Sequence, residues 1–202
     1  QKETPNAAAL VSACCLCSKA SFDDSAEESS KAVKERNVFG DATECGLLRF
    51  AANRINVLEE REMHPKVYEI PFSSATKWHL TSHEWGKNED SSTSFYRIFL
   101  KGAPERVIGM CTQILKTSQP EPIDEQVMTS FNSAYETYAS NGQRVLAFAY
   151  LDLPASKWPQ GFAFEGAGSN GKPNFPIEGL TFVGLVALMD PPKRGVRKAV
   201  AA

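Results

Sequence analysis

The chain has 202 residues, of which 42% are hydrophobic and 23% charged, which are the proportions of an ordinary globular domain. Its 22 basic and 24 acidic side chains give a formal net charge of −2, and this balance argues against a nucleic-acid-binding platform. The longest strongly apolar run, 180–189, is about half as long as a membrane-spanning helix. Five cysteines without a framework-like spacing favour a reducing compartment over a disulfide-stabilised secreted domain.

The first third of the chain predicts helices. Thr4 followed by Pro5 is typical of a helix start, and this helix is expected to run to about residue 19. The polar, acidic stretch 21–34 predicts a solvated loop or a short exposed helix. Two more helices are expected at capping-box patterns, in which an acidic residue follows a capping residue by three positions: Asp41 with Glu44, and Asn56 with Glu59. Pro65 ends the last of them.

Three short segments rich in β-forming residues follow and predict antiparallel strands: 67–70, 78–80 and 95–100. The linker 86–93 predicts a hairpin loop, and Pro104 a short helix. The clearest helix pattern runs over 124–141, with Gly142 at the position of a C-terminal cap. Its apolar face comprises Val127, Phe131, Ala134 and Tyr138.

Segments 145–153 and 180–189 predict buried strands. The Pro- and Gly-rich stretch between them, 154–179, is either an excursion packed by Trp158, Phe162 and Phe164 or partly mobile. The succession of helices, strands, a helix and strands again predicts an α+β fold rather than a regular βαβ alternation.

Two chemical motifs are more simply interpreted as structural. Gly166, Gly168 and Gly171 match G-x-G-x-x-G, but they lie in the Pro-rich loop and not between a strand and a helix. Cys14, Cys15 and Cys17 have no second ligand pair at metal-binding spacing, so they are interpreted as small buried hydrophobes. No metal-binding residue is predicted in this chain. No catalytic constellation is apparent, and no catalytic residue is predicted in this chain.

Five short segments occur in a fixed order: 40–44, 71–77, 101–105, 142–146 and 190–193. They read Gly-Asp-Ala-Thr-Glu, Pro-Phe-Ser-Ser-Ala-Thr-Lys, Lys-Gly-Ala-Pro-Glu, Gly-Gln-Arg-Val-Leu and Asp-Pro-Pro-Lys. Together they resemble the nucleotide-binding (N) domain of type II P-type cation-transporting ATPases, over nearly the whole chain. Segments 69–72, 122–125 and 182–185 look most like the sodium/potassium and proton/potassium pump branch. The resemblance implies a twisted, mainly antiparallel sheet flanked by helices.

The resemblance also implies an ATP pocket with an aromatic wall and several cations. Phe72 would stack on adenine, although alone it would be interpreted as a core phenylalanine at a strand end. Lys77 would line the pocket beneath the nucleotide, and Lys101 its mouth near the phosphates. Gly102 would let the backbone approach the ligand.

Three further residues acquire roles by resemblance. Glu44 would accept a hydrogen bond from the adenine amino group, or serve only in its capping box. Arg144 would reach the phosphates or the ribose, or be a surface arginine beside a helix cap. His79 stands where the sodium/potassium pumps carry Gln, so we expect ATP affinity to change between pH 6 and 8 by more than nucleotide ionisation explains.

The resemblance divides the chain into the N domain, 1–189, and a hinge with the start of the return to the phosphorylation domain, 190–202. The hinge residues are Asp190, Pro191, Pro192 and Lys193, the last standing where the family usually has Arg. The phosphorylated aspartate motif D-K-T-G-T, the motif T-G-E-S and the magnesium motif G-D-G-x-N-D do not occur in these residues. The segment alone is therefore expected to bind ATP without hydrolysing it.

In the parent protein, the resemblance implies ATP with Mg²⁺ as cofactors and the phosphorylation, actuator and transmembrane domains of the same chain as partners. An accessory subunit is left open, and no nucleic-acid partner is expected. The expected location is the cytoplasmic side of a multi-pass membrane protein, in the plasma membrane, where the pump exchanges sodium for potassium. The alternatives are a calcium- or sodium-exporting pump, a degenerate interaction or regulatory module that keeps the fold, and a self-sufficient nucleotide hydrolase.

Overall fold

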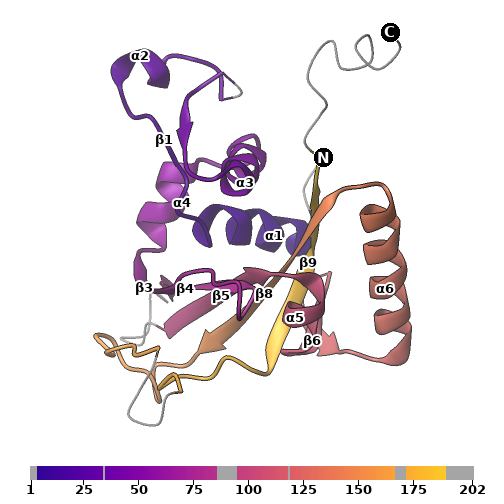
Figure 1. The fold of residues 1–202 in the computed structure, drawn as a ribbon. Coiled ribbons are helices and arrows are strands. Elements are labelled where there is room, and N and C mark those ends of the chain that lie inside the picture. The colour runs from indigo at the N-terminus through magenta and orange to yellow at the C-terminus, as the bar shows by residue number, and fades with distance from the viewer. Residues whose placement is uncertain (1–3, 34, 86–94, 118, 167–171, 190–202) are drawn as a thin grey trace, which may run out of the picture.

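The computed structural model describes residues 4–33, 35–85, 95–117, 119–166 and 172–189. In these ranges, a central sheet carries helices on both faces (Figure 1). The sheet has seven strands among the described residues, in the order β3-β4-β5-β8-β9-β6-β7. The strands are β3 Lys66–Ile70, β4 Trp78–Trp85, β5 Phe95–Gly102, β6 Cys111–Lys116, β7 Gln119–Pro122, β8 Arg144–Leu153 and β9 Leu180–Leu188.

Nearly all neighbouring strands in this sheet are antiparallel. The exception is β6, which runs parallel to β9. Because side chains alternate between the two faces of a strand, the central strands β5 and β8 supply both hydrophobic cores. Phe99 and Phe148 face one core, whereas Leu100 and Ala147 face the other. The predicted α+β class with a mainly antiparallel sheet is confirmed.

One face of the sheet is covered by α1 (Pro5–Leu16), α3 (Ala42–Ala52) and α4 (Val57–Met63). A small extension contains β1 (Ser21–Phe22), α2 (Ala26–Ser29) and β2 (Val38–Phe39), with β1 antiparallel to β2. Asp41 caps α3 by accepting hydrogen bonds from the backbone N–H groups of Thr43 and Glu44. Thr4 precedes α1 as predicted, but its side chain makes no capping bond, and the helix ends at Leu16, earlier than expected.

The opposite face is covered by α5 (Pro104–Ile108), α6 (Glu125–Ser140) and the excursion after β8. Helix α6 has the predicted limits, and Gly142 adopts the left-handed conformation of a C-terminal cap, with φ of 71°. In the excursion, Phe164 packs edge-on against Tyr96, Phe162 and Phe175. The described part of this loop is therefore packed, as the first of the two predicted alternatives has it.

The sequence did not predict β6 and β7, nor the short pair β1 and β2. Prolines such as Pro120 and Pro122 are unusual in a strand, but β7 lies at the edge of the sheet, where a missing N–H is tolerated. The predicted hairpin loop 86–93 lies in the range 86–94, outside the described residues, as do hinge residues 190–193. Among the described helices, none combines the length and hydrophobicity needed to cross a membrane.

Candidate functional site

A cavity of about 510 Å³ opens where the start of α3 meets the ends of β4, β5 and β8. Its volume lies in the range of small-molecule sites. It is lined by Asp41, Ala42, Thr43, Glu44, Phe72, His79, Lys101, Gly102, Arg144 and Leu146. Of the residues predicted to bind ATP, only Lys77 is missing from this lining. The lining residues on β4, β5 and β8 are brought together because His79 pairs with Lys101, and Lys101 with Phe148, across adjacent strands.

The floor of the pocket holds a buried ion pair. Lys101 Nζ donates to Glu44 Oε1 at 2.5 Å and to the backbone oxygen of Cys17 at 2.6 Å. Only 6% of Lys101 and 8% of Glu44 is exposed. An ammonium group has three N–H donors, so these bonds leave one for a ligand. Lys101 is thus a buried residue of the pocket lining, and its expected place near the phosphates stays a prediction.

Glu44 does not complete its predicted capping box. Its Oε2 accepts the backbone N–H of Lys19 at 3.0 Å, and its Oε1 faces Lys101, so the carboxylate is turned away from the helix cap. Burial would raise the pKa of Glu44, but hydrogen bonds from His79 and Lys101 and the Lys101 charge lower it to about 2. The carboxylate is therefore held ionised as part of the site.

His79 lies beside this pair with only 2% of its surface exposed. Its Nε2 is 2.9 Å from Glu69 Oε1, and its Nδ1 is 3.5 Å from Glu44 Oε1. Glu69, which sequence reasoning did not single out, also pairs with Lys19 at 3.0 Å and Lys66 at 2.7 Å. We refer to Glu44, Glu69, His79 and Lys101 as the buried charged network. The sequence feature that could have identified Glu69 is its place in the 69–72 segment, two residues before Pro71.

The outer wall of the pocket is apolar. Phe72 and Leu146 line it and also border a neighbouring hollow of about 400 Å³. Phe72 is 62% exposed, so it is not the core phenylalanine that was weighed as the alternative. Lys77 is exposed and lines the neighbouring hollow rather than the pocket itself. Its expected place beneath the nucleotide stays a prediction.

Gly102 has a structural role besides the one expected. A Cβ on this residue would lie 2.4 Å from the backbone oxygen of Lys77 and 2.8 Å from Trp78 Cα. The glycine therefore permits close approach of β4 to β5. It also lines the pocket, and its expected contact with a ligand stays a prediction. Lys77 itself adopts a left-handed conformation, with φ of 62°, at this crossing.

Arg144 closes one side of the pocket. It is exposed, and its Nη1 donates to Thr43 Oγ1 at 2.6 Å, which links the start of β8 to the first turn of α3. A guanidinium has five N–H donors in a planar fork, so most of its capacity remains for an anionic ligand. The pocket thus combines an apolar wall, a buried ammonium and a guanidinium at its rim, which suits an aromatic anion.

The cysteines near the pocket are structural. Cys14, Cys15 and Cys17 are buried, and burial raises the pKa of the Cys15 thiol to about 11, well away from a reactive thiolate. Within the described ranges, no group of three or more His, Cys, Asp or Glu side chains is arranged to hold a metal ion.

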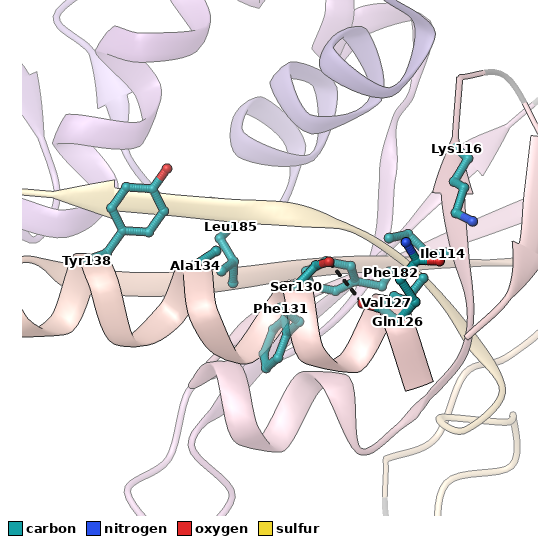
Figure 2. Close-up of a pocket in the computed structure, with 10 residues that line it drawn as sticks. All are labelled: Ile114, Lys116, Gln126, Val127, Ser130, Phe131, Ala134, Tyr138, Phe182 and Leu185. Atoms are coloured by element: carbon teal, nitrogen blue, oxygen red, sulfur yellow. Dashed lines mark hydrogen bonds between the residues drawn. The ribbon is translucent and has the colours of Figure 1, made fainter. Parts of the chain in front are cut away.

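A second hollow, of about 540 Å³, lies on the opposite face of the sheet, between α6 and strands β6 and β9 (Figure 2). We call it the α6 groove. It is lined by Ile114, Lys116, Gln126, Val127, Ser130, Phe131, Ala134, Tyr138, Phe182 and Leu185. The predicted apolar face of α6 forms its wall. Lys116, the one charged residue among these ten, pairs with Glu121 at 3.0 Å.

Comparison with known proteins identifies the family of this chain. Residues 6–195 match the family model described as P-type ATPase, cytoplasmic domain N. The chain is 39% identical over 193 residues to a sodium/potassium-transporting ATPase subunit alpha-A of Artemia franciscana, covering 95% of this chain and 18% of that protein. It is 39% identical over 200 residues to the human sodium/potassium-transporting ATPase subunit alpha-2, covering 98% of this chain and 19% of that protein.

The chain therefore belongs to the P-type ATPase N-domain family. It spans about a fifth of the length of the curated relatives that it matches.

Proposed function

We propose that this domain binds ATP in the pocket between α3 and the ends of β4, β5 and β8. The observation that carries the proposal is that one cavity is lined both by the exposed ring of Phe72 and by the buried ammonium of Lys101. Two of the three N–H groups of this ammonium are used by Cys17 and Glu44, which leaves one for a ligand. Phe72 is 62% exposed, yet it lines a cavity together with Lys101 and Arg144. An aromatic base and a polyanionic tail on one molecule satisfy both parts of such a pocket.

The residues present fit the two ends of ATP. Phe72 offers a face for base stacking, which contributes about 1–3 kcal/mol per base. Glu44, held ionised, can accept from an exocyclic amino group. Lys101 and Arg144 supply positive charge for phosphates, and exposed Lys77 in the neighbouring hollow supplies more. Since the two hollows share Phe72 and Leu146, a ligand longer than one hollow can extend into both.

For the parent protein, the family and the names of the relatives support a larger role. We infer that the domain presents ATP to the phosphorylation domain of a membrane pump of the sodium/potassium type in the plasma membrane. ATP would act there with Mg²⁺, and 190–193 would form the hinge to that domain. The phosphorylation motif is not among these 202 residues, so the domain alone is expected to bind ATP without releasing phosphate.

The test is a calorimetric titration of ATP into the purified domain, with Phe72→Ala and Phe39→Ala beside it. Phe39 is 61% exposed and lies outside the pocket lining, so its replacement is a matched control. Phe72→Ala should weaken ATP binding about 5- to 150-fold, the equivalent of one stacked base. Phe39→Ala should leave it unchanged.

Other results would favour other functions. An absence of saturable binding at millimolar ATP would contradict the proposal and favour an interaction or regulatory module that keeps the fold. Steady phosphate release by the purified domain would favour a self-sufficient hydrolase. Equal weakening by both phenylalanine replacements would place the nucleotide elsewhere.

A further inference from the structure

The carboxyl end of α1 lies against the floor of the pocket. Lys101 Nζ donates to the backbone oxygen of Cys17 at 2.6 Å, and the backbone N–H of Lys19 donates to Glu44 Oε2 at 3.0 Å. We call residues 17–20, which follow α1, the α1 connector. Both hydrogen bonds use its main chain, so the position of the connector backbone determines where the ammonium and the carboxylate of the pocket lie.

Cations from two other elements bind the carboxyl end of α1. The last carbonyl groups of a helix have no partner within it, and this end has a partial negative charge. Helix α1 has no basic residue in its own last turn. Instead, Lys101 of β5 binds the Cys17 carbonyl, and Arg61 of α4, a helix near α1 in Figure 1, binds a backbone oxygen on each side of it. Arg61 Nη2 donates to the oxygens of Cys15 at 3.0 Å and Ala20 at 2.9 Å, so one nitrogen joins the last turn of α1 to the end of the connector.

Two other side-chain contacts of the connector are weaker or local. Lys19 Nζ pairs with Glu69 Oε1 at 3.0 Å, but 55% of the Lys19 side chain is exposed, and exposed pairs contribute little. Ser18 Oγ accepts the backbone N–H of Ala20 at 3.1 Å, within the connector itself. Arg61, in contrast, makes charge-assisted hydrogen bonds from a different helix. It is not a lining residue of the pocket or of the neighbouring hollow, so its short-range effect on a ligand there passes through the connector.

We propose that Arg61 is a positioning residue for nucleotide binding: by holding the α1 connector, it keeps the Cys17 carbonyl and the Lys19 N–H where they orient Lys101 and Glu44. This inference rests on the proposed ATP site, and it extends that site to a residue of α4, a helix that lines neither hollow. A displaced connector would deprive the buried ammonium of an acceptor and the buried carboxylate of a donor, and unpaired buried polar groups are costly. The two side chains would then shift toward other partners and would no longer present the same groups to a ligand.

The first experiment measures ATP dissociation constants by calorimetry for the wild type, Arg61→Met and Arg36→Met. Arg36 is a matched control, because it is also half-buried and also binds two backbone oxygens, those of Ser29 at 2.7 Å and Lys31 at 2.9 Å. These oxygens lie in the extension between β1 and β2, outside the pocket lining. Arg61→Met should raise the dissociation constant about fivefold or more, the lower end of typical coupling between sites. Arg36→Met, which removes the same charge, should leave it unchanged.

The free energy of unfolding distinguishes a positioning role from a purely structural one. Both methionine variants should lose stability, since each leaves two backbone oxygens without their donor. If Arg61→Met lowered stability but left ATP affinity unchanged, the inference would be wrong. Arg61→Lys keeps the charge and N–H donors on a shorter side chain, and it should weaken ATP binding less than Arg61→Met does. If Arg61→Met does not fold, Arg61→Lys compared with Arg36→Lys provides the same test.

A second measurement needs no nucleotide. The side-chain carboxyl ¹³C shift of Glu44 depends on its contacts with Lys19 and Lys101. Recorded well above the pKa of this carboxyl, the shift should change in Arg61→Met and keep its wild-type value in Arg36→Met. A Glu44 shift that is the same in Arg61→Met and in the wild type would overturn the inference.

The two experiments separate the inference from the proposed function. Saturable ATP binding with the same dissociation constant in the wild type and Arg61→Met would overturn the inference and leave the ATP site in place. No ATP binding by the wild type would overturn the ATP site, and the Glu44 carboxyl shift would then decide whether Arg61 positions Glu44.

Discussion

The two faces of the sheet hold hollows of similar volume but opposite chemistry. Toward α3, the pocket of about 510 Å³ has the buried charged network at its floor. Toward α6, the groove of about 540 Å³ is walled by Val127, Phe131 and Leu185, and its single charged lining residue is exposed. Burying charge requires compensating partners, and burying methyl groups does not. The sheet therefore has buried, paired charges on one face and ordinary apolar packing on the other.

The difference is sharpest for the two lysines. Lys101 is buried against Glu44, whereas Lys116 forms an exposed pair with Glu121. Removing one partner of a buried pair leaves an uncompensated charge and costs about 3–5 kcal/mol. Exposed pairs contribute only about 0–1 kcal/mol. Lys101→Met should lower the free energy of unfolding by about 3–5 kcal/mol in urea denaturation, and Lys116→Met by about 1 kcal/mol or less.

If Lys101→Met left the free energy of unfolding unchanged or raised it, the contrast between the buried and the exposed lysine would be wrong. It would mean that Glu44 takes up a proton or water once its partner is removed. The double variant Lys101→Met with Glu44→Gln distinguishes the two cases, since it removes both charges. It should recover most of the stability lost in Lys101→Met.

The two faces of the sheet should also differ in how their contributions to stability respond to acid pH. The pKa of Glu44 falls from an ordinary value of about 4.5 to about 2, because its hydrogen bonds and ion pair outweigh the effect of burial. Its stabilising effect is therefore complete above pH 4.5 and is lost as the pH falls from 4.5 toward 2, on the order of 2 kcal/mol. Glu69, whose pKa is likewise lowered to about 2, adds to this loss in the same window.

Urea denaturation between pH 3 and 6 measures this loss. Glu44→Gln should be less stable at pH 6 and should depend less on pH. Phe131→Leu, on the groove face, should lower stability by the same amount at each pH. An unchanged pH slope in Glu44→Gln would mean that Glu44 is not the group that titrates.

Local patterns predicted most of the fold. The 3.6-residue period and terminal glycine placed α6 within one residue at each end, and three β-rich segments placed β3, β4 and β5. The strands that were missed had weak local signals. β7 contains two prolines, and β1 and β2 have two residues each, so only pairing with a neighbour defines them.

The sequence predicted which residues come together better than it predicted how they are arranged in space. The family resemblance identified Glu44, Phe72, His79, Lys101 and Arg144, and these residues line one pocket. It could not tell which lysine is buried, because that depends on strand alternation and on the Cys17 carbonyl brought in by α1. The bridge from His79 to Glu69 likewise exists only once β3 pairs with β4.

The smallest expected effect concerns the rim of the pocket, where Thr43 Oγ1 accepts from Arg144 Nη1 at 2.6 Å. This bond holds an otherwise exposed guanidinium beside the cavity with its remaining donors unused. Thr43→Val keeps the side-chain shape but removes the acceptor, at a cost of about 0.5–1.5 kcal/mol. We expect ATP affinity to fall about 2- to 10-fold, and the free energy of unfolding to change little because Arg144 is exposed.

Thr43→Ser, which keeps the hydroxyl, should bind ATP like the wild type. In an Arg144→Ala background, Thr43→Val should have no further effect, because the group that it positions is gone. Calorimetry on the wild type, Thr43→Val, Arg144→Ala and the double variant completes a double-mutant cycle. If Thr43→Val instead raised ATP affinity, the bond would be a restraint that the ligand must break, and Arg144 would reach the nucleotide only after leaving α3.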